Sequence, residues 1–202
     1  AEDTVAPEAR AQVLRRLARV QEALGETAAA IASLHAVGKI DGRDVELVET
    51  VARLAATAGQ VETLPALWVE LADLADAGAA TAASAAERRL AAAAALGDAG
   101  DLAAAAAVLE ALLAKQPEHA DALRRLESVR RALGDAAGAA SALKALAASA
   151  TESTARAAAL REAAAATELV DPSDALDLWR QVAAIEPDAV DANEAIDRLL
   201  AH

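Results

Sequence analysis

Eight arginines are the residues of this chain best suited to recognising another molecule. They stand on segments whose apolar residues recur at helical spacing, in a chain that holds 19 basic residues against 32 acidic ones. A guanidinium group can contact a carboxylate through two parallel hydrogen bonds, so a group of arginines favours binding of an acidic partner. The set consists of Arg15, Arg16, Arg19, Arg53, Arg124, Arg125, Arg131 and Arg161.

A structural role for the same arginines is the alternative. Arginine on a helix surface often pairs with an acid three or four residues away on its own helix. Arg15, Arg19 and Glu22 have this spacing, and so do Glu49 and Arg53. Such exposed pairs add little stability and imply no partner, and the sequence leaves both interpretations open.

No residue pattern indicates catalysis or metal binding. His35, His119 and His202 are far apart in the sequence and have no metal-ligand spacing. The sequence contains no cysteine, no phosphate-binding glycine loop and no calcium-loop pattern. We therefore expect a noncatalytic protein that holds no cofactor and no metal.

The charge and the apolar pattern restrict the partners further. The formal net charge of −13 would repel phosphates, so we expect no nucleic acid partner. Charges interrupt every long apolar stretch, so we expect no membrane insertion. The chain begins with Ala-Glu-Asp and shows no secretion leader, which fits a cytoplasmic or a periplasmic location. Its bias toward Ala, Arg and Asp suggests a GC-rich coding source, and we expect a segment of a larger protein of bacterial type.

The elements that would position these residues are helices. Alanine, the strongest helix former, dominates the 55% hydrophobic content, and aromatic residues make up 1%. The same 34-residue interval separates Gly25 from Gly59 and Gly100 from Gly134, which indicates stacked helix-turn-helix repeats. We predict one all-α domain over 1–202, a right-handed αα-superhelix of about five repeats with a C-terminal capping helix. The predicted units are 7–42, 44–77, 81–117, 118–149 and 151–187, and the cap is 188–202.

Two segments depart from a plain repeat. Gly59 and Gly100 are 41 residues apart, and the surplus of seven falls around Gly78, as a longer loop, a longer helix or a hinge between two blocks. The last helix is expected to place Val190, Ile196, Leu199 and Leu200 on one side and its acids elsewhere, as a solvating cap.

The residues around the turn glycines resemble the tetratricopeptide repeat family. In the first unit, Leu14, Leu17 and Ala18 stand where the family has Trp, Leu and Gly. The second helix has Ala, a large apolar residue and Ala in the family, and here these places hold Ala30, Leu34 and Val37. Trp68 and Trp179 share one register position, where we expect them to pack between helices; a partner-binding anchor is the alternative.

The resemblance implies a binding groove. In this family the first helix of each unit lines a concave face, so the eight arginines would make the groove more basic than the rest of the protein. Leu90, with Ala91 and Ala94, would make the third unit apolar and able to contact a partner closely. The resemblance thus favours an interaction scaffold that binds a protein or an acidic peptide. The alternative is self-assembly through the array ends or the apolar third unit, and the oligomeric state stays open.

A more specific family site matches only in part. Some tetratricopeptide domains clamp a terminal carboxylate with Lys and Asn on first helices, and Arg15, Arg19 and Thr50 stand at three of those places. The third unit has Glu87 and Ala91 where that clamp needs basic groups. We therefore do not predict binding of chaperone tails.

Overall fold

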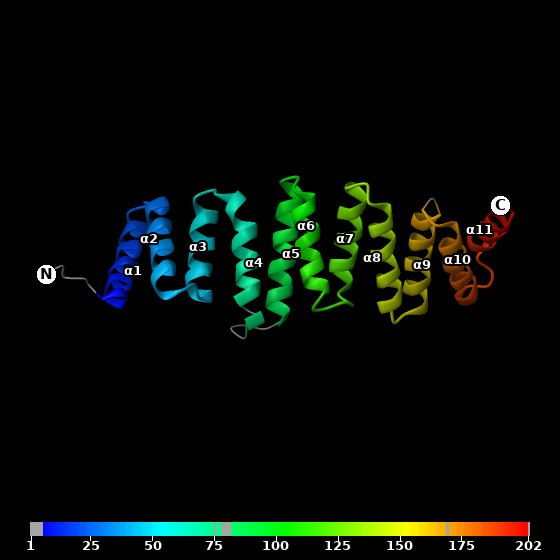
Figure 1. Ribbon diagram of the computed structural model, residues 1–202, viewed down its shortest axis with the longest axis horizontal. Coiled ribbons are helices and arrows are strands. Elements are labelled where there is room, and N and C mark those ends of the chain that lie inside the picture. The colour runs from blue at the N-terminus through cyan, green and yellow to red at the C-terminus, as the bar shows by residue number, and fades with distance from the viewer. Residues whose placement is uncertain (1–5, 75, 78–81, 169, 202) are drawn as a thin grey trace. The chain divides into compact units, whose positions relative to one another are not determined.

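The computed structural model describes residues 6–74, 76–77, 82–168 and 170–201, except the side chains of 82–84. Its regular structure in these residues is helical throughout, as Figure 1 shows, which confirms the all-α prediction. A first compact unit, Ala1–Ala99, holds α1 (Pro7–Ala23), α2 (Thr27–Asp41), α3 (Val45–Thr57), the short 3₁₀ helix η1 (Val61–Thr63), α4 (Leu64–Leu74) and α5 (Ala82–Asp98). A second unit, Gly100–His202, holds α6 (Leu102–Leu113), α7 (Ala120–Ala132), α8 (Ala136–Ser149), α9 (Ser153–Thr167), α10 (Pro172–Ile185) and α11 (Val190–Leu200).

The turns between paired helices follow the predicted glycine period. A left-handed backbone at the end of a helix favours glycine, because other residues place a Cβ against the chain there. After α1, the backbone N–H of Glu26 donates to the Gln21 carbonyl at 2.8 Å and closes the turn. The four glycines that set the 34-residue interval all have this conformation, with φ of +77°, +72°, +83° and +75° at Gly25, Gly59, Gly100 and Gly134.

Acidic residues begin several of the helices. The Asp44 carboxylate accepts from the N–H of Leu47 at 2.8 Å, and Asp135 accepts from Gly138 at the same distance. Asp101 and Asp171 cap α6 and α10 in the same way. These caps satisfy amide groups that have no partner within the helix. Part of the acidic charge of the chain is therefore structural.

The core of the first unit depends on close packing around alanine. Ala11 and Ala18 are the buried residues of α1, and Ala30 of α2 is fully buried beside them. Small side chains let two helices approach closely. Val48 and Val51 of α3 and Leu67 of α4 belong to the same core, and Trp68 of α4 packs against it.

The second unit combines buried alanines with larger buried side chains. Leu109, Leu143 and Val182 are almost fully buried on α6, α8 and α10. Trp179 is also buried, and its indole N–H donates to Glu168 Oε1 at 2.9 Å. Both tryptophans therefore pack against helices of their own unit, as predicted.

The structure corrects the predicted apolar face of the last helix and shows how the first helix packs. Leu17, which the resemblance aligns with the family's Leu, is exposed on α1, whereas Leu14, Ala11 and Ala18 pack into the core. Helix α11 turns Val190 and Leu200 to solvent, whereas Ile196 and Leu199 pack inward. A helix that packs against a neighbour on one side buries only one stripe of its own surface. Residues outside that stripe are exposed.

The compact units do not follow the predicted repeat boundaries. The division falls between Ala99 and Gly100, inside the predicted unit 81–117. The seven-residue surplus around Gly78 lies largely outside the described residues, so its predicted form and the single domain over 1–202 stay predictions. Within the described residues, no helix is long and apolar enough to cross a membrane.

Candidate functional site

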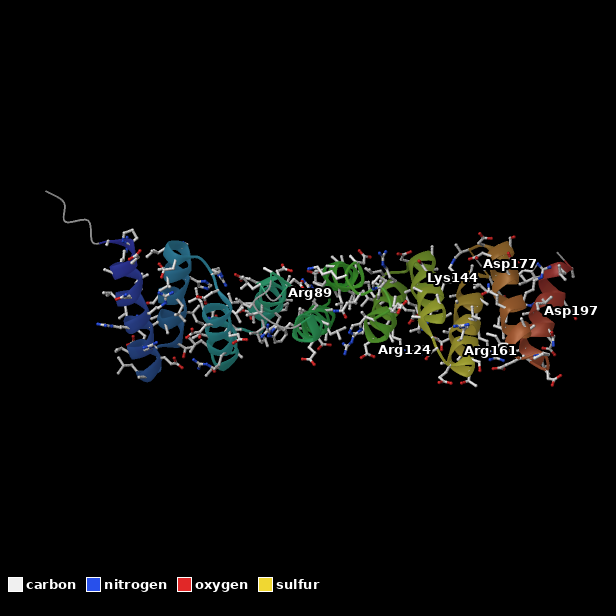
Figure 2. The ribbon with its side chains drawn as sticks, turned by 90° about the horizontal axis from the view of Figure 1, so that it is seen from below. Arg89, Arg124, Lys144, Arg161, Asp177 and Asp197 are labelled. Carbon is white, nitrogen blue, oxygen red and sulfur yellow. The ribbon has the colours of Figure 1, made fainter. Side chains whose placement is uncertain are left out.

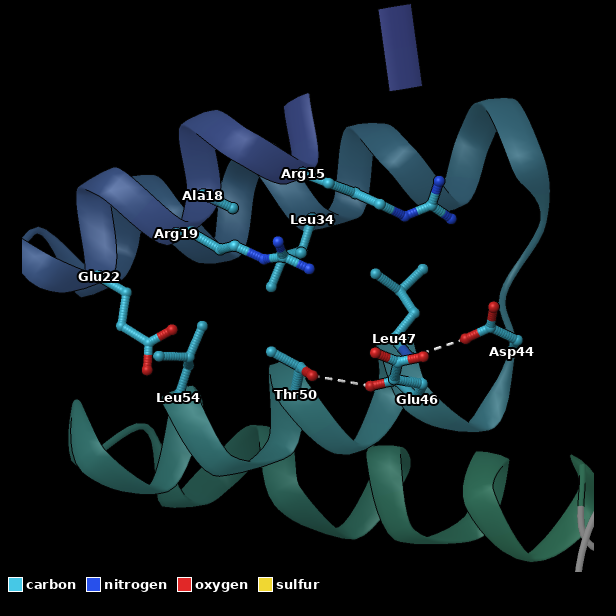
Figure 3. Close-up of a pocket in the computed structure, with 10 residues that line it drawn as sticks. All are labelled: Arg15, Ala18, Arg19, Glu22, Leu34, Asp44, Glu46, Leu47, Thr50 and Leu54. Carbon is cyan, nitrogen blue, oxygen red and sulfur yellow. Dashed lines mark hydrogen bonds between the residues drawn. The ribbon is translucent and has the colours of Figure 1, made fainter. Parts of the chain in front are cut away.

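A pocket of about 340 Å³ opens between α1, α2 and α3 in the first unit. Figure 3 shows it with α1 on one side and α3 on the other. It combines an apolar base with charged side chains at the opening. Its lining residues are Arg15, Ala18, Arg19, Glu22, Leu34, Asp44, Glu46, Leu47, Thr50 and Leu54.

The base of the pocket belongs to the core of the unit. Leu47 and Leu54 are seven residues apart on α3, so they lie two turns apart on one face of that helix. Leu34 of α2 and Ala18 of α1 complete the apolar surface, and all four residues are buried. The pocket is therefore fixed by helix packing and is present without a ligand.

Two of the predicted arginines meet at this pocket. Arg15 and Arg19 are one turn apart on α1, and Arg19 points from α1 toward Thr50 on α3 (Figure 3). Arg15 Nη1 donates to Asp41 Oδ2 at 2.6 Å. Among the described residues, Arg19 has no ion pair and is exposed. The Thr50 hydroxyl donates to the Glu46 carbonyl at 2.8 Å, so its oxygen is left to accept a further hydrogen bond.

The acids of the pocket are partly engaged elsewhere. Glu22 Oε1 lies 2.8 Å from Arg53 Nη1, and Asp44 caps α3. Glu46 has no ion pair within the described part of the chain. The opening thus presents one unpaired guanidinium on α1 and one unpaired carboxylate on α3.

Several other predicted arginines are paired with acids of other helices. Arg124 of α7 lies 3.9 Å from Glu162 of α9, and Arg161 of α9 lies 2.8 Å from Asp191 of α11. In Figure 2, Arg124 and Arg161 lie toward one side of the second unit. Arg53 pairs with Glu22 of α1, where the sequence suggested Glu49 of its own helix. The structural alternative placed such pairs within one helix, whereas these arginines pair with acids on other helices. Their role in binding a partner stays a prediction.

The remaining predicted residues do not join the pocket. Arg131 pairs with Glu127 on its own helix. Arg16 and Arg125 are exposed and have no ion pair among the described residues. Leu90 is half-buried on α5, with Ala91 exposed next to it. Of the nine predicted site residues, the structure brings only Arg15 and Arg19 together in this pocket.

Two arginines on α5 were not predicted as site residues. Arg88 Nη2 lies 2.6 Å from Glu49 Oε1 of α3. Arg89 is buried, and its Nη2 lies 2.5 Å from Asp73 Oδ1 and 2.7 Å from Asp76 Oδ2. The only signal in the sequence was two adjacent arginines beside an alanine-rich segment. The sequence could not identify their partners, because Glu49 and Asp73 lie on other helices.

Titration shifts in the chain have structural causes. Hydrogen bonds from the Arg161 guanidinium lower the pKa of Glu186 and of Asp191. Burial, followed by the charge of Arg43, lowers the pKa of His35. No group of three potential metal ligands exists among the described residues.

No family model and no curated protein matches the chain. The solved structures that are similar to it include the MamA protein, at 17% identity over 88% of this chain and 92% of that one, with a TM-score of 0.45. A tetratricopeptide repeat protein from Parabacteroides merdae shows 15% identity over 95% and 73%, with a TM-score of 0.44. The putative kinesin light chain TPR-like repeats of Podosopora anserina show 22% identity over 90% and 97%, with a TM-score of 0.45.

The chain is similar to tetratricopeptide repeat proteins. These TM-scores are below 0.5, so the prediction of helical repeats rests on the helices and glycine turns of this chain. The binding site rests on its own pocket.

Proposed function

We propose that the chain is a noncatalytic interaction scaffold that binds a peptide in the pocket between α1 and α3. A carboxylate of the peptide pairs with Arg19, and a neighbouring aliphatic side chain rests on Leu47 and Leu54. The observation that carries this proposal is the unpaired Arg19 guanidinium beside a preformed apolar base within one pocket.

The size and chemistry of the pocket suit this role. Ligand sites are concave, apolar and preformed, with a few polar groups that orient the ligand, and about 300 Å³ is their lower size range. A pocket of about 340 Å³ accepts one or two side chains of a peptide. Arg15 would have to exchange Asp41 for the ligand, whereas Arg19 loses no existing ion pair. We therefore assign the main contact to Arg19 and a supporting one to Arg15.

Selection from a random peptide library tests the proposal. We expect enrichment of sequences with an acidic group next to an aliphatic residue. In fluorescence anisotropy, Arg19→Glu should weaken a selected peptide about tenfold or more, because a hydrogen bond to a charged group is replaced by repulsion. Binding should also weaken with salt, since exposed charges are screened over about 8–10 Å.

Arg180→Glu is the matched control. It makes the same charge change on an exposed arginine of α10 in the other unit. The affinity of this variant should equal that of the wild type. An equal loss of peptide affinity in both variants would show an effect of net charge alone. It would contradict binding in the pocket.

A further inference from the structure

Helix α1 carries an apolar stripe that no other described helix covers. Val13, Leu17, Val20 and Leu24 follow one another at intervals of four, three and four residues and are all exposed. This spacing places them on one face of the helix. Soluble proteins rarely leave several large apolar residues together in water, and such a patch marks an interaction site.

The repeat register shows what kind of surface this is. One 34-residue period after Val13, Leu17 and Val20, helix α3 has Leu47, Val51 and Leu54. On α1 these residues are 62%, 43% and 55% exposed; on α3 they are 7%, 2% and 2% exposed, because α3 packs against the preceding helix α2. Helix α1 thus presents the surface with which α3 contacts the hairpin before it. Its chemistry is that of a repeat interface.

Basic residues border the stripe. At 100° per residue, Arg10 lies beside Leu17 on one edge and Arg16 lies beside Val20 on the other. Glu8 and Glu22 fall on other sides of α1. The uncovered face is therefore apolar and basic.

Helix α11 offers a complementary surface. Val190 and Leu200 are exposed on the side away from its buried residues Ala192 and Ala195. The same side carries exposed acids at positions 194 and 197, and Asp197 is visible there in Figure 2.

The acidic residues of this face are available to pair with a basic partner. Glu194 and Asp197 have no ion pair within the described residues. The one basic residue of α11, Arg198, is held by Glu168 at 2.8 Å. The uncovered face of α11 is therefore apolar and acidic, opposite in charge to that of α1.

We propose that α1 of one copy of this chain docks on α11 of a second copy. The apolar stripe meets Val190 and Leu200, and Arg10 and Arg16 meet Glu194 and Asp197. This contact joins different surfaces of the two copies, so a bound pair leaves one α1 surface and one α11 surface free for further copies unless a ring closes. One helix face buries less than about 1,200 Å², which is the range of weak, transient interfaces. Association therefore grows with protein concentration and weakens as salt rises.

Sedimentation velocity on a dilution series of the full chain tests the contact. The wild type should shift to larger species as concentration rises. A basic-face variant, Arg10→Glu with Arg16→Glu, should stay monomeric over the same range, and so should an acidic-face variant, Glu194→Arg with Asp197→Arg. Mixing equal amounts of the two variants should restore association, because each surface again meets an opposite charge.

Two further variants complete the design. Leu17→Glu should abolish association without loss of helix content, because Leu17 is exposed. Lys39→Glu should associate like the wild type, since Lys39 is exposed on the side of α2 opposite Ala30 and Val37. The residues changed in all these variants lie outside the peptide pocket, so failure of the contact between α1 and α11 leaves the proposed function intact.

Three outcomes would overturn the proposal. The first is a wild type that stays monomeric at the highest attainable concentration. The second is association that the basic-face variant loses and the acidic-face variant keeps, since α1 would then bind a surface other than α11. The third is a variant mixture that remains monomeric.

Discussion

Fully buried alanines set the helix spacing in both units. Ala30 on α2 and Ala105 on α6 have no exposed surface. A leucine at either position adds three carbon atoms where no space exists. We expect Ala30→Leu and Ala105→Leu each to lower the free energy of unfolding by about 1–3 kcal/mol, measured by urea denaturation.

Exposed alanines on the same helices supply the controls. Ala32→Leu on α2 and Ala107→Leu on α6 add the same atoms toward solvent. Their unfolding free energies should stay within about 0.5 kcal/mol of the wild type. Buried and exposed variants of equal stability would mean that the assigned helix faces are wrong.

Two glycines near the end of α5 should respond in opposite directions. Gly100 has φ of +83°, a conformation that costs a residue with a Cβ about 1–2 kcal/mol. Gly97 lies within α5, and a Cβ there meets no atom within 4 Å. Thermal unfolding should show Gly100→Ala less stable than the wild type and Gly97→Ala more stable, by about 0.5–1 kcal/mol for the latter. Destabilisation by both changes would contradict the turn geometry.

Residue types that repeat with the period could be predicted, whereas ion-pair partners could not. The turn glycines and the buried Ala30 and Val37 follow from helical spacing and the 34-residue interval. Glu22 is the partner of Arg53, but it lies on α1, so a rule that considers one helix at a time cannot find it. The exposure of Leu17 also escaped, because the period treats the first helix like an internal one.

Between elements, Glu168 joins three helices of the second unit. It follows α9, accepts the indole N–H of Trp179 from α10, and pairs with Arg198 of α11. The Arg198 hydrogen bond, and then that of Trp179, lower the pKa of Glu168 below its usual range, although burial acts against them.

The lowered pKa of Glu168 predicts a pH dependence of stability. Because the folded state holds the carboxylate charged, its contribution is fully present above the unfolded pKa of about 4.3 and is lost as pH falls through the folded value. Glu168→Gln should therefore be less stable than the wild type at neutral pH, and the difference should shrink below about pH 4. Urea denaturation of both proteins, followed by Trp179 fluorescence in a Trp68→Phe background, measures it.

The corresponding control is Glu87→Gln, which changes an exposed acid of α5. The difference in unfolding free energy between Glu87→Gln and the wild type should not become smaller from neutral to acidic pH. If the unfolding free energies of Glu168→Gln and the wild type differ by a constant amount across this pH range, the charge of the Glu168 carboxylate does not stabilise the folded state.

At the scale of the whole molecule, the two compact units allow their stabilities to be followed separately. Trp68 belongs to the first unit and Trp179 to the second. In a repeat protein, a core change acts mainly on its own repeat and on its neighbours. Ala30→Leu should therefore move the Trp68 transition in urea more than the Trp179 transition, with each tryptophan observed in the absence of the other.

Ala105→Leu should show the reverse order, since α6 belongs to the second unit. Equal shifts of both transitions in both variants would indicate a single cooperative core. The sequence predicted the repeats but not the division after Ala99. A repeat period shows that hairpins are similar, but it does not show how tightly one hairpin packs against the next.

The central claim, that the pocket between α1 and α3 binds an acidic peptide, is tested most directly by locating a bound peptide. Backbone amide signals of the labelled full chain would be followed by NMR as a library-selected peptide is added. The account predicts the largest shifts on α1 around Arg19 and on α3 between Leu47 and Leu54. Shifts concentrated in the second unit, with these segments unchanged, would contradict it.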